Sequence, residues 1–81
     1  MGSRRSSVQV ISEILQHDQA TKTEIMYKSN LSHSQMEKYL NFLEDRCFLI
    51  RSENNGRKYA VTDKGKQLVK DIEKLWEIFE L

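Results

Sequence analysis

Residues 21–35 read TKTEIMYKSNLSHSQ and contain two helix-start signals eleven positions apart. In each signal a hydroxyl residue is followed three positions later by a side chain that can return a hydrogen bond: Thr21 with Glu24, and Ser32 with Gln35. Asn30 ends the apolar stretch between them, and asparagine tolerates the left-handed conformation that closes helices. Two short helices joined by about three residues form a helix-turn-helix.

The helical pattern extends to both sides of this stretch. An apolar series at helical spacing, from Val8 to Leu15, predicts a first helix over residues 6–17. The second start signal predicts a third helix over about residues 32–46. The three helices therefore follow one another with short connections.

A hairpin is expected directly after the third helix. Residues 48–52 (FLIRS) are rich in strand formers, and Asn55-Gly56 is the strongest short hairpin signal. Residues 57–61 form the return strand, which has to pack on the helices because an isolated hairpin is unstable. A last helix is predicted over residues 62–81, where Gly65 in the first turn is expected to be a mild cost.

This order of elements predicts the fold class. It is α+β, mostly α: a winged helix-turn-helix with three helices, a two-stranded β-wing and a C-terminal, coiled-coil-like dimerisation helix. We expect a winged-helix domain over residues 1–61 and a dimerisation helix over residues 62–81, together one structural unit.

Composition limits the class of protein. The 81 residues are 38% hydrophobic and 31% charged, as expected for one soluble globular domain. No apolar run approaches the ~20 residues that span a bilayer. The net charge of +1 by itself would not indicate a nucleic-acid partner. A single cysteine excludes an intramolecular disulfide and, with no secretion signal, indicates the cytoplasm.

The sequence contains no recognisable catalytic constellation. His17, His33 and Cys47 lack the spacing of metal ligands, so we expect no metal and no cofactor. No nucleophile–base pair, carboxylate dyad or glycine-rich phosphate loop is evident. We therefore expect that the protein is not an enzyme and has no small-molecule substrate. If the third helix reaches Cys47, this residue falls on its apolar face, which predicts a buried small hydrophobe rather than a redox sensor.

The opposite face of the third helix is the candidate binding surface. Met36, Leu40 and Leu43 share the core face, whereas Ser34, Lys38 and Asn41 lie across from them. Such polar side chains hydrogen-bond to base edges and phosphates. The expected DNA contacts are Ser32, His33, Ser34, Gln35, Lys38 and Asn41 on this helix, and Arg51, Asn55, Arg57 and Lys58 on the wing.

Two features favour a plainer interpretation of that surface. Every amphipathic helix has a polar outer face, and Glu37, Glu44 and Asp45 would repel phosphate. The basic residues of the wing could instead protect an edge strand from aggregation.

The last helix carries an apolar stripe with the spacing of a coiled-coil seam. The stripe predicts a two-fold dimer, because it would leave a large exposed patch on a monomer. Part of it could alternatively fold back onto the first helix. The expected dimer contacts are Leu68, Val69, Ile72, Leu75, Trp76 and Phe79.

Three segments resemble those of archaeal winged-helix DNA-binding proteins, a group of small transcriptional regulators of archaea and their viruses and ten-kilodalton chromatin proteins. The segments are residues 23–32, 39–45 and 59–65, and the resemblance covers about residues 8–72. It implies binding of double-stranded DNA by a homodimer joined through an antiparallel coiled coil of the last helices. The last helix is shorter here than in the chromatin proteins and the charge is nearer neutral, which favours a site-specific regulator.

The expected function is therefore that of a homodimeric transcriptional regulator located with the nucleoid. Helix 32–46 would read the major groove, and the wing, about residues 52–58, would contact the backbone or minor groove. The alternative is a winged-helix protein–protein interaction module with no DNA binding of its own.

Overall fold

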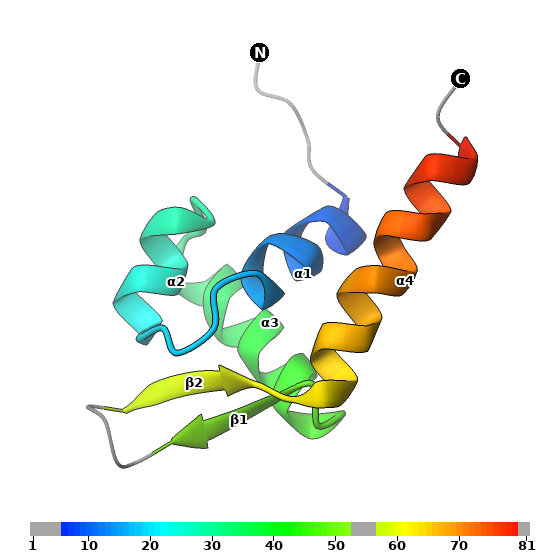
Figure 1. The fold of residues 1–81 in the computed structure, drawn as a ribbon. Coiled ribbons are helices and arrows are strands. Elements are labelled where there is room, and N and C mark those ends of the chain that lie inside the picture. Colours follow the sequence, from blue (N-terminus) through cyan, green and yellow to red (C-terminus); the bar gives the residue numbers. More distant parts are fainter. Residues whose placement is uncertain (1–5, 53–56, 80–81) are drawn as a thin grey trace.

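The computed structural model describes residues 6–52 and 57–79 and has the expected order of elements (Figure 1). Three helices come first: α1 (Ser7–Leu15), α2 (Lys22–Lys28) and α3 (His33–Asp45). The antiparallel strands β1 (Leu49–Ser52) and β2 (Lys58–Val61) form the wing, and α4 (Asp63–Phe79) follows. The winged-helix prediction is confirmed, and the limits of the elements lie within two residues of the expected ones. The predicted continuation of the last helix over residues 80–81 lies outside the described residues.

Both predicted helix starts are reciprocal capping boxes. The Thr21 hydroxyl accepts the Glu24 N–H at 3.1 Å, and the Glu24 carboxylate accepts the Thr21 N–H at 2.9 Å. Ser32 and Gln35 exchange the same two bonds at 3.2 and 3.0 Å. These bonds satisfy N–H groups that a helix leaves without an internal partner, so they fix where α2 and α3 begin.

The same two helices end in left-handed residues. Asn30 has φ 55° as expected, and the next N–H, of Leu31, bonds to the Met26 carbonyl at 3.0 Å. At the end of α3 the left-handed residue is Cys47, with φ 63°. Its N–H bonds to the Glu44 carbonyl at 3.0 Å. These are the hydrogen bonds of a Schellman ending.

The expected burial of Cys47 is wrong. Its side chain is exposed, because α3 ends two residues earlier and the backbone reverses its hand at this position. A helical-wheel angle has no meaning beyond the last helical residue.

Strand β2 is paired on both of its edges. Toward β1, Tyr59 is the register partner of Arg51. On the other edge Tyr59 forms an isolated bridge with Ala20: its N–H bonds to the Ala20 carbonyl at 2.7 Å, and its carbonyl accepts the Ala20 N–H at 3.2 Å. Because Ala20 immediately precedes the cap of α2, this bridge places the start of α2 beside the wing.

All of the helices and both strands contribute to one hydrophobic core. α4 packs against it through Leu68 and Val69, which are half-buried, and Ile72 of the same helix is buried as well. The buried apolar residues outside α4 are Val10, Ile14, Leu15, Ala20, Ile25, Leu31, Met36, Leu40, Leu43, Leu49, Tyr59 and Val61.

Gly65, which the sequence analysis treated only as a mild cost to the helix, is the point at which α4 meets the base of the wing. A Cβ at this position would collide with the Phe48 carbonyl oxygen and would lie 2.8 Å from Cγ1 of Val61. Thr62 caps the helix here, accepting the Gly65 N–H at 3.0 Å. Glycine is therefore required by a close approach of the backbone.

Within residues 6–52 and 57–79, no helix is both long and apolar enough to cross a membrane.

Candidate nucleic-acid interface

Helix α3 presents the two faces that the sequence predicts. Met36, Leu40 and Leu43 are at most 2% exposed. On the other side the polar residues Ser34, Lys38 and Asn41 are exposed. Within the described chain, Lys38 forms no ion pair, so its ammonium group is available to a ligand.

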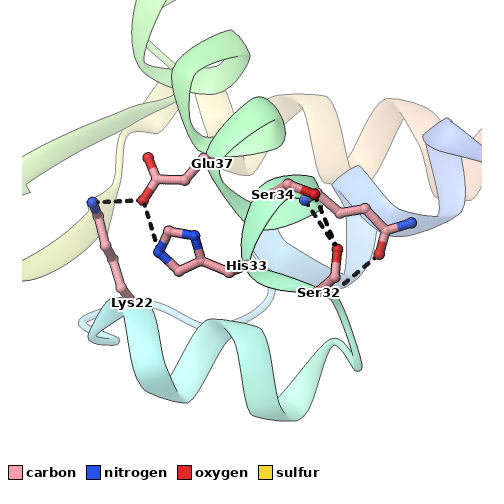
Figure 2. Close-up of polar contacts among 6 residues, drawn as sticks. Lys22, Ser32, His33, Ser34 and Glu37 are labelled. Atoms are coloured by element: carbon pink, nitrogen blue, oxygen red, sulfur yellow. Dashed lines mark hydrogen bonds and ion pairs between the residues drawn. The ribbon is translucent and has the colours of Figure 1, made fainter.

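The first turn of α3 is also exposed, although part of its hydrogen-bonding capacity is already used. The Ser32 hydroxyl and the Gln35 carbonyl oxygen make the capping box, and Ser34 Oγ lies 3.4 Å from Ser32 Oγ (Figure 2). The Gln35 amide NH₂ is the group that remains to donate a hydrogen bond to a base edge.

Glu37 is neutralised by a contact between α2 and α3. The Lys22 ammonium donates to Glu37 Oε2 at 3.0 Å, and His33 Nε2 lies 3.7 Å from the same oxygen (Figure 2). The hydrogen bond from Lys22 lowers the pKa of the Glu37 carboxyl and raises the pKa of the Lys22 ammonium. The carboxylate that counted against phosphate binding in the sequence is thus already paired, and His33 faces it.

This pairing predicts an acid-sensitive contribution to stability. A carboxyl whose pKa is lowered by folding, from 4.5 in this case, stabilises the fold above that value and loses the effect as the pH falls through the folded pKa. The Glu37→Gln variant should therefore lose less of its Tm between pH 6 and pH 3, values chosen to span roughly this range. Thermal unfolding followed by circular dichroism measures this.

The control for that experiment is Glu77→Gln, at an exposed position of α4. It should keep the decline of the wild type. Parallel curves for the wild type and Glu37→Gln would show that the contact between α2 and α3 is not formed in solution.

On the wing, the structure separates the predicted basic residues. Arg51 lies on the inner face, 3.5 Å from Glu44 of α3, with its guanidinium 5.5 Å from the centre of the Tyr59 ring. Arg57 is exposed and Lys58 is half-buried, whereas Asn55 lies outside the described residues. Arg51 is therefore partly committed to α3, and Arg57 is the freer of the two arginines.

The structure also adds residues that the sequence analysis missed. A groove of about 450 Å³ runs beside α3. It contains Phe42, which is 38% exposed and has the Arg46 guanidinium 4.0 Å from the centre of its ring. The feature of the sequence that could have indicated this groove is Phe42 itself, a large aromatic residue outside the apolar face of the third helix. The groove is lined by Ser7, Ile11, Gln35, Lys38, Tyr39 and Phe42.

A second, basic pocket lies between the start of α2 and the wing, with a volume of about 250 Å³. Nothing in the sequence indicated that these segments are adjacent, because the bridge between Ala20 and Tyr59 is a tertiary contact. The pocket is lined by Thr21, Lys22, Thr23, Arg51, Arg57 and Tyr59.

The stripe on α4 is divided in two by the fold. Ile72 is buried and Leu68 and Val69 are half-buried within the protomer, so these three predicted dimer contacts have less free surface than the end of the helix. In the last two turns Leu75 is 52% exposed, Trp76 41% and Phe79 72%. Ile78, which was not predicted, is also exposed. We refer to Leu75, Trp76, Ile78 and Phe79 as the terminal apolar patch.

Comparison with known proteins shows the family. The model of the winged helix-turn-helix family matches residues 4–80, and the chain belongs to this family. The uncharacterized protein MJ0287 of Methanocaldococcus jannaschii is 36% identical over 78 residues, which are 93% of this chain and 77% of that protein. MJ0290 of the same organism, also uncharacterized, is 32% identical over 96% of this chain, which spans only 36% of that protein.

Solved structures support the same fold. The structure is similar to Sso10a-2, described as a DNA-binding protein from Sulfolobus solfataricus, with a TM-score of 0.83 and 29% identity over 94% of this chain and 83% of that one. A MarR family protein from Bacillus stearothermophilus has a TM-score of 0.69 over 96% of this chain and 61% of its own. At 15% identity, this second likeness shows the fold alone. The resemblance to archaeal winged-helix proteins is confirmed.

Proposed function

We propose that the protein binds double-stranded DNA as a homodimer and regulates transcription, without enzymatic activity. The observation that carries the proposal is the exposed polar face of α3, on which Lys38 is unpaired within the described chain while Glu37 and Glu44 each have a cationic partner. The family and the likeness to a DNA-binding protein of Sulfolobus solfataricus support it.

In the proposed complex α3 enters the major groove. Ser34, Lys38 and Asn41 would meet bases or phosphates, and the Gln35 amide would reach a base edge. Lys22 and Arg51 act indirectly, because they neutralise two carboxylates that would otherwise repel the duplex. Arg57 would contact the backbone or the minor groove from the wing, where narrow grooves attract arginine.

The proposed dimer uses the terminal apolar patch. Four large apolar side chains within the last five described residues are more exposed than a stable monomer usually allows. Pairing two copies of α4 about a two-fold axis would cover them. The two α3 helices would then meet half-sites about one helical turn apart, on a roughly palindromic site.

Lys38→Gln tests the DNA interface. Loss of one phosphate contact should weaken binding to all duplexes about threefold to tenfold and lower the salt slope by about one. Asn41→Ala should instead reduce the preference for one base pair, because asparagine reads base edges. Fluorescence anisotropy against mixed and selected duplexes, at several salt concentrations, measures both effects.

Lys70→Gln is the matched control, since it removes the same charge from an exposed position of α4. No saturable binding of the wild type at low salt would refute the proposal. The protein-interaction module would then be preferred, with the groove that contains Phe42 as its contact surface.

A further inference from the structure

The basic pocket between α2 and the wing contains a buried hydroxyl without an acceptor. Tyr59 is 1% exposed, and no residue that the structure describes accepts a hydrogen bond from its hydroxyl. A buried hydroxyl without a partner is costly, so native structures seldom leave one unexplained.

The neighbours of this hydroxyl explain why its proton has no acceptor. Arg51 is the cross-strand partner of Tyr59, and its guanidinium lies 5.5 Å from the centre of the ring. The charge interaction with Tyr59, followed by that with Glu44, raises the pKa of Arg51, so the guanidinium and the phenol lie close together. Tyr59 also contributes, after Glu37, to the raised pKa of Lys22. Ammonium and guanidinium groups have donors but no acceptor, so neither can receive the tyrosine proton.

The rest of the lining has the same chemical character. Arg57 completes a set of three cations, and within the described chain it makes no ion pair. Thr23 adds a hydroxyl. Two of these cations already have an ion-pair partner that does not line the pocket: Lys22 pairs with Glu37, and Arg51 pairs with Glu44. An ammonium group has three N–H donors and a guanidinium group has five, so each side chain keeps donors for a second acceptor.

We propose that this pocket binds a phosphate group, which accepts hydrogen bonds from the Tyr59 hydroxyl and from the three basic side chains. A phosphate oxyanion supplies the acceptor that the lining lacks, and its charge matches the cations. Two sources carry this chemistry: a small phosphorylated ligand and the DNA backbone. The burial of Tyr59, which is 1% exposed, favours the small ligand, because a small phosphate approaches a buried group more easily than a phosphate fixed in a duplex does.

Inorganic phosphate is the first probe, titrated into the ¹⁵N-labelled full chain and followed by amide chemical shifts. We expect saturable shifts confined to residues 21–23, 51 and 57–59. Tyr59→Phe should weaken phosphate binding about tenfold, the value of a hydrogen bond to a charged group. Its Tm should change little, because the hydroxyl that the variant removes has no acceptor for its proton.

Arg57→Gln, at an exposed position, is the second variant and should weaken binding without affecting the fold. Lys28→Gln is its control, because it removes the same charge from the other end of α2. Shifts that fail to saturate, that spread over all lysine-bearing surfaces, or that persist unchanged in both pocket variants would overturn the proposal.

A further experiment with duplex DNA distinguishes the two sources of the phosphate group. If the site serves a small ligand, Tyr59→Phe leaves duplex affinity unchanged and added duplex does not displace phosphate. If the backbone occupies the pocket, the duplex competes with phosphate and Tyr59→Phe weakens both. A failure of duplex binding to the wild type affects only the proposed DNA function, because the phosphate titration contains no DNA.

Discussion

Gly65→Ala is expected to destabilise the protein by about 3 kcal/mol, at the upper end of overpacking effects. The new Cβ would meet the Phe48 carbonyl oxygen and Cγ1 of Val61, both of which are held by the base of the wing. Backbone cannot rotate aside as a flexible side chain can. The gain in helix propensity, up to about 1 kcal/mol, is too small to compensate.

Thermal and urea unfolding measure this effect. A loss of about 3 kcal/mol corresponds to a Tm lower by roughly 12–24 °C in a domain of this size. Lys70→Ala, at an exposed position of the same helix, should change Tm little. A Gly65→Ala variant as stable as the wild type would show that α4 and the wing do not approach each other as closely as in the structure.

The double change Trp76→Gln and Phe79→Gln is expected to convert the proposed dimer into a monomer. Removing two large aromatic side chains from an apolar contact should weaken association by about a hundredfold or more. The fold itself should survive, because neither side chain belongs to the hydrophobic core. Sedimentation at micromolar concentration gives the mass, and circular dichroism gives the helix content.

Lys74→Gln is the control, since it changes an exposed position of α4 without removing apolar surface. A wild-type protein that sediments as a monomer, or a double variant that remains dimeric, would exclude the terminal apolar patch as the interface. With a dimeric wild type, the double variant should also bind a two-half-site duplex more weakly than the wild type, while its binding to a single half-site is unchanged.

The local elements were predictable from the chain because their signals are local. Thr21 with Glu24 and Ser32 with Gln35 specify helix starts through hydrogen bonds that span three residues. The positions of Met36, Leu40 and Leu43 repeat with the helical period, so the buried face of α3, and with it the opposite exposed face, could be read directly.

Other features were decided by contacts between distant segments, which no local pattern encodes. Cys47 was assigned to a buried face because the wheel was continued past the end of the helix. Gly65 appeared unfavourable within its helix and is required by the wing. The apolar stripe of α4 gave no indication of where intramolecular packing stops, and Ile72 proved to be a core residue.

The sequence alone therefore determined the order of the elements, their limits and the polar face of α3, because capping and periodicity act over a few residues. Tertiary structure decided the charge that this face presents, by pairing Lys22 with Glu37 and Arg51 with Glu44. It also created the basic pocket, because the bridge between Ala20 and Tyr59 joins segments 39 residues apart. Electrostatic pairing depends on distance in space, and only the folded chain defines that distance.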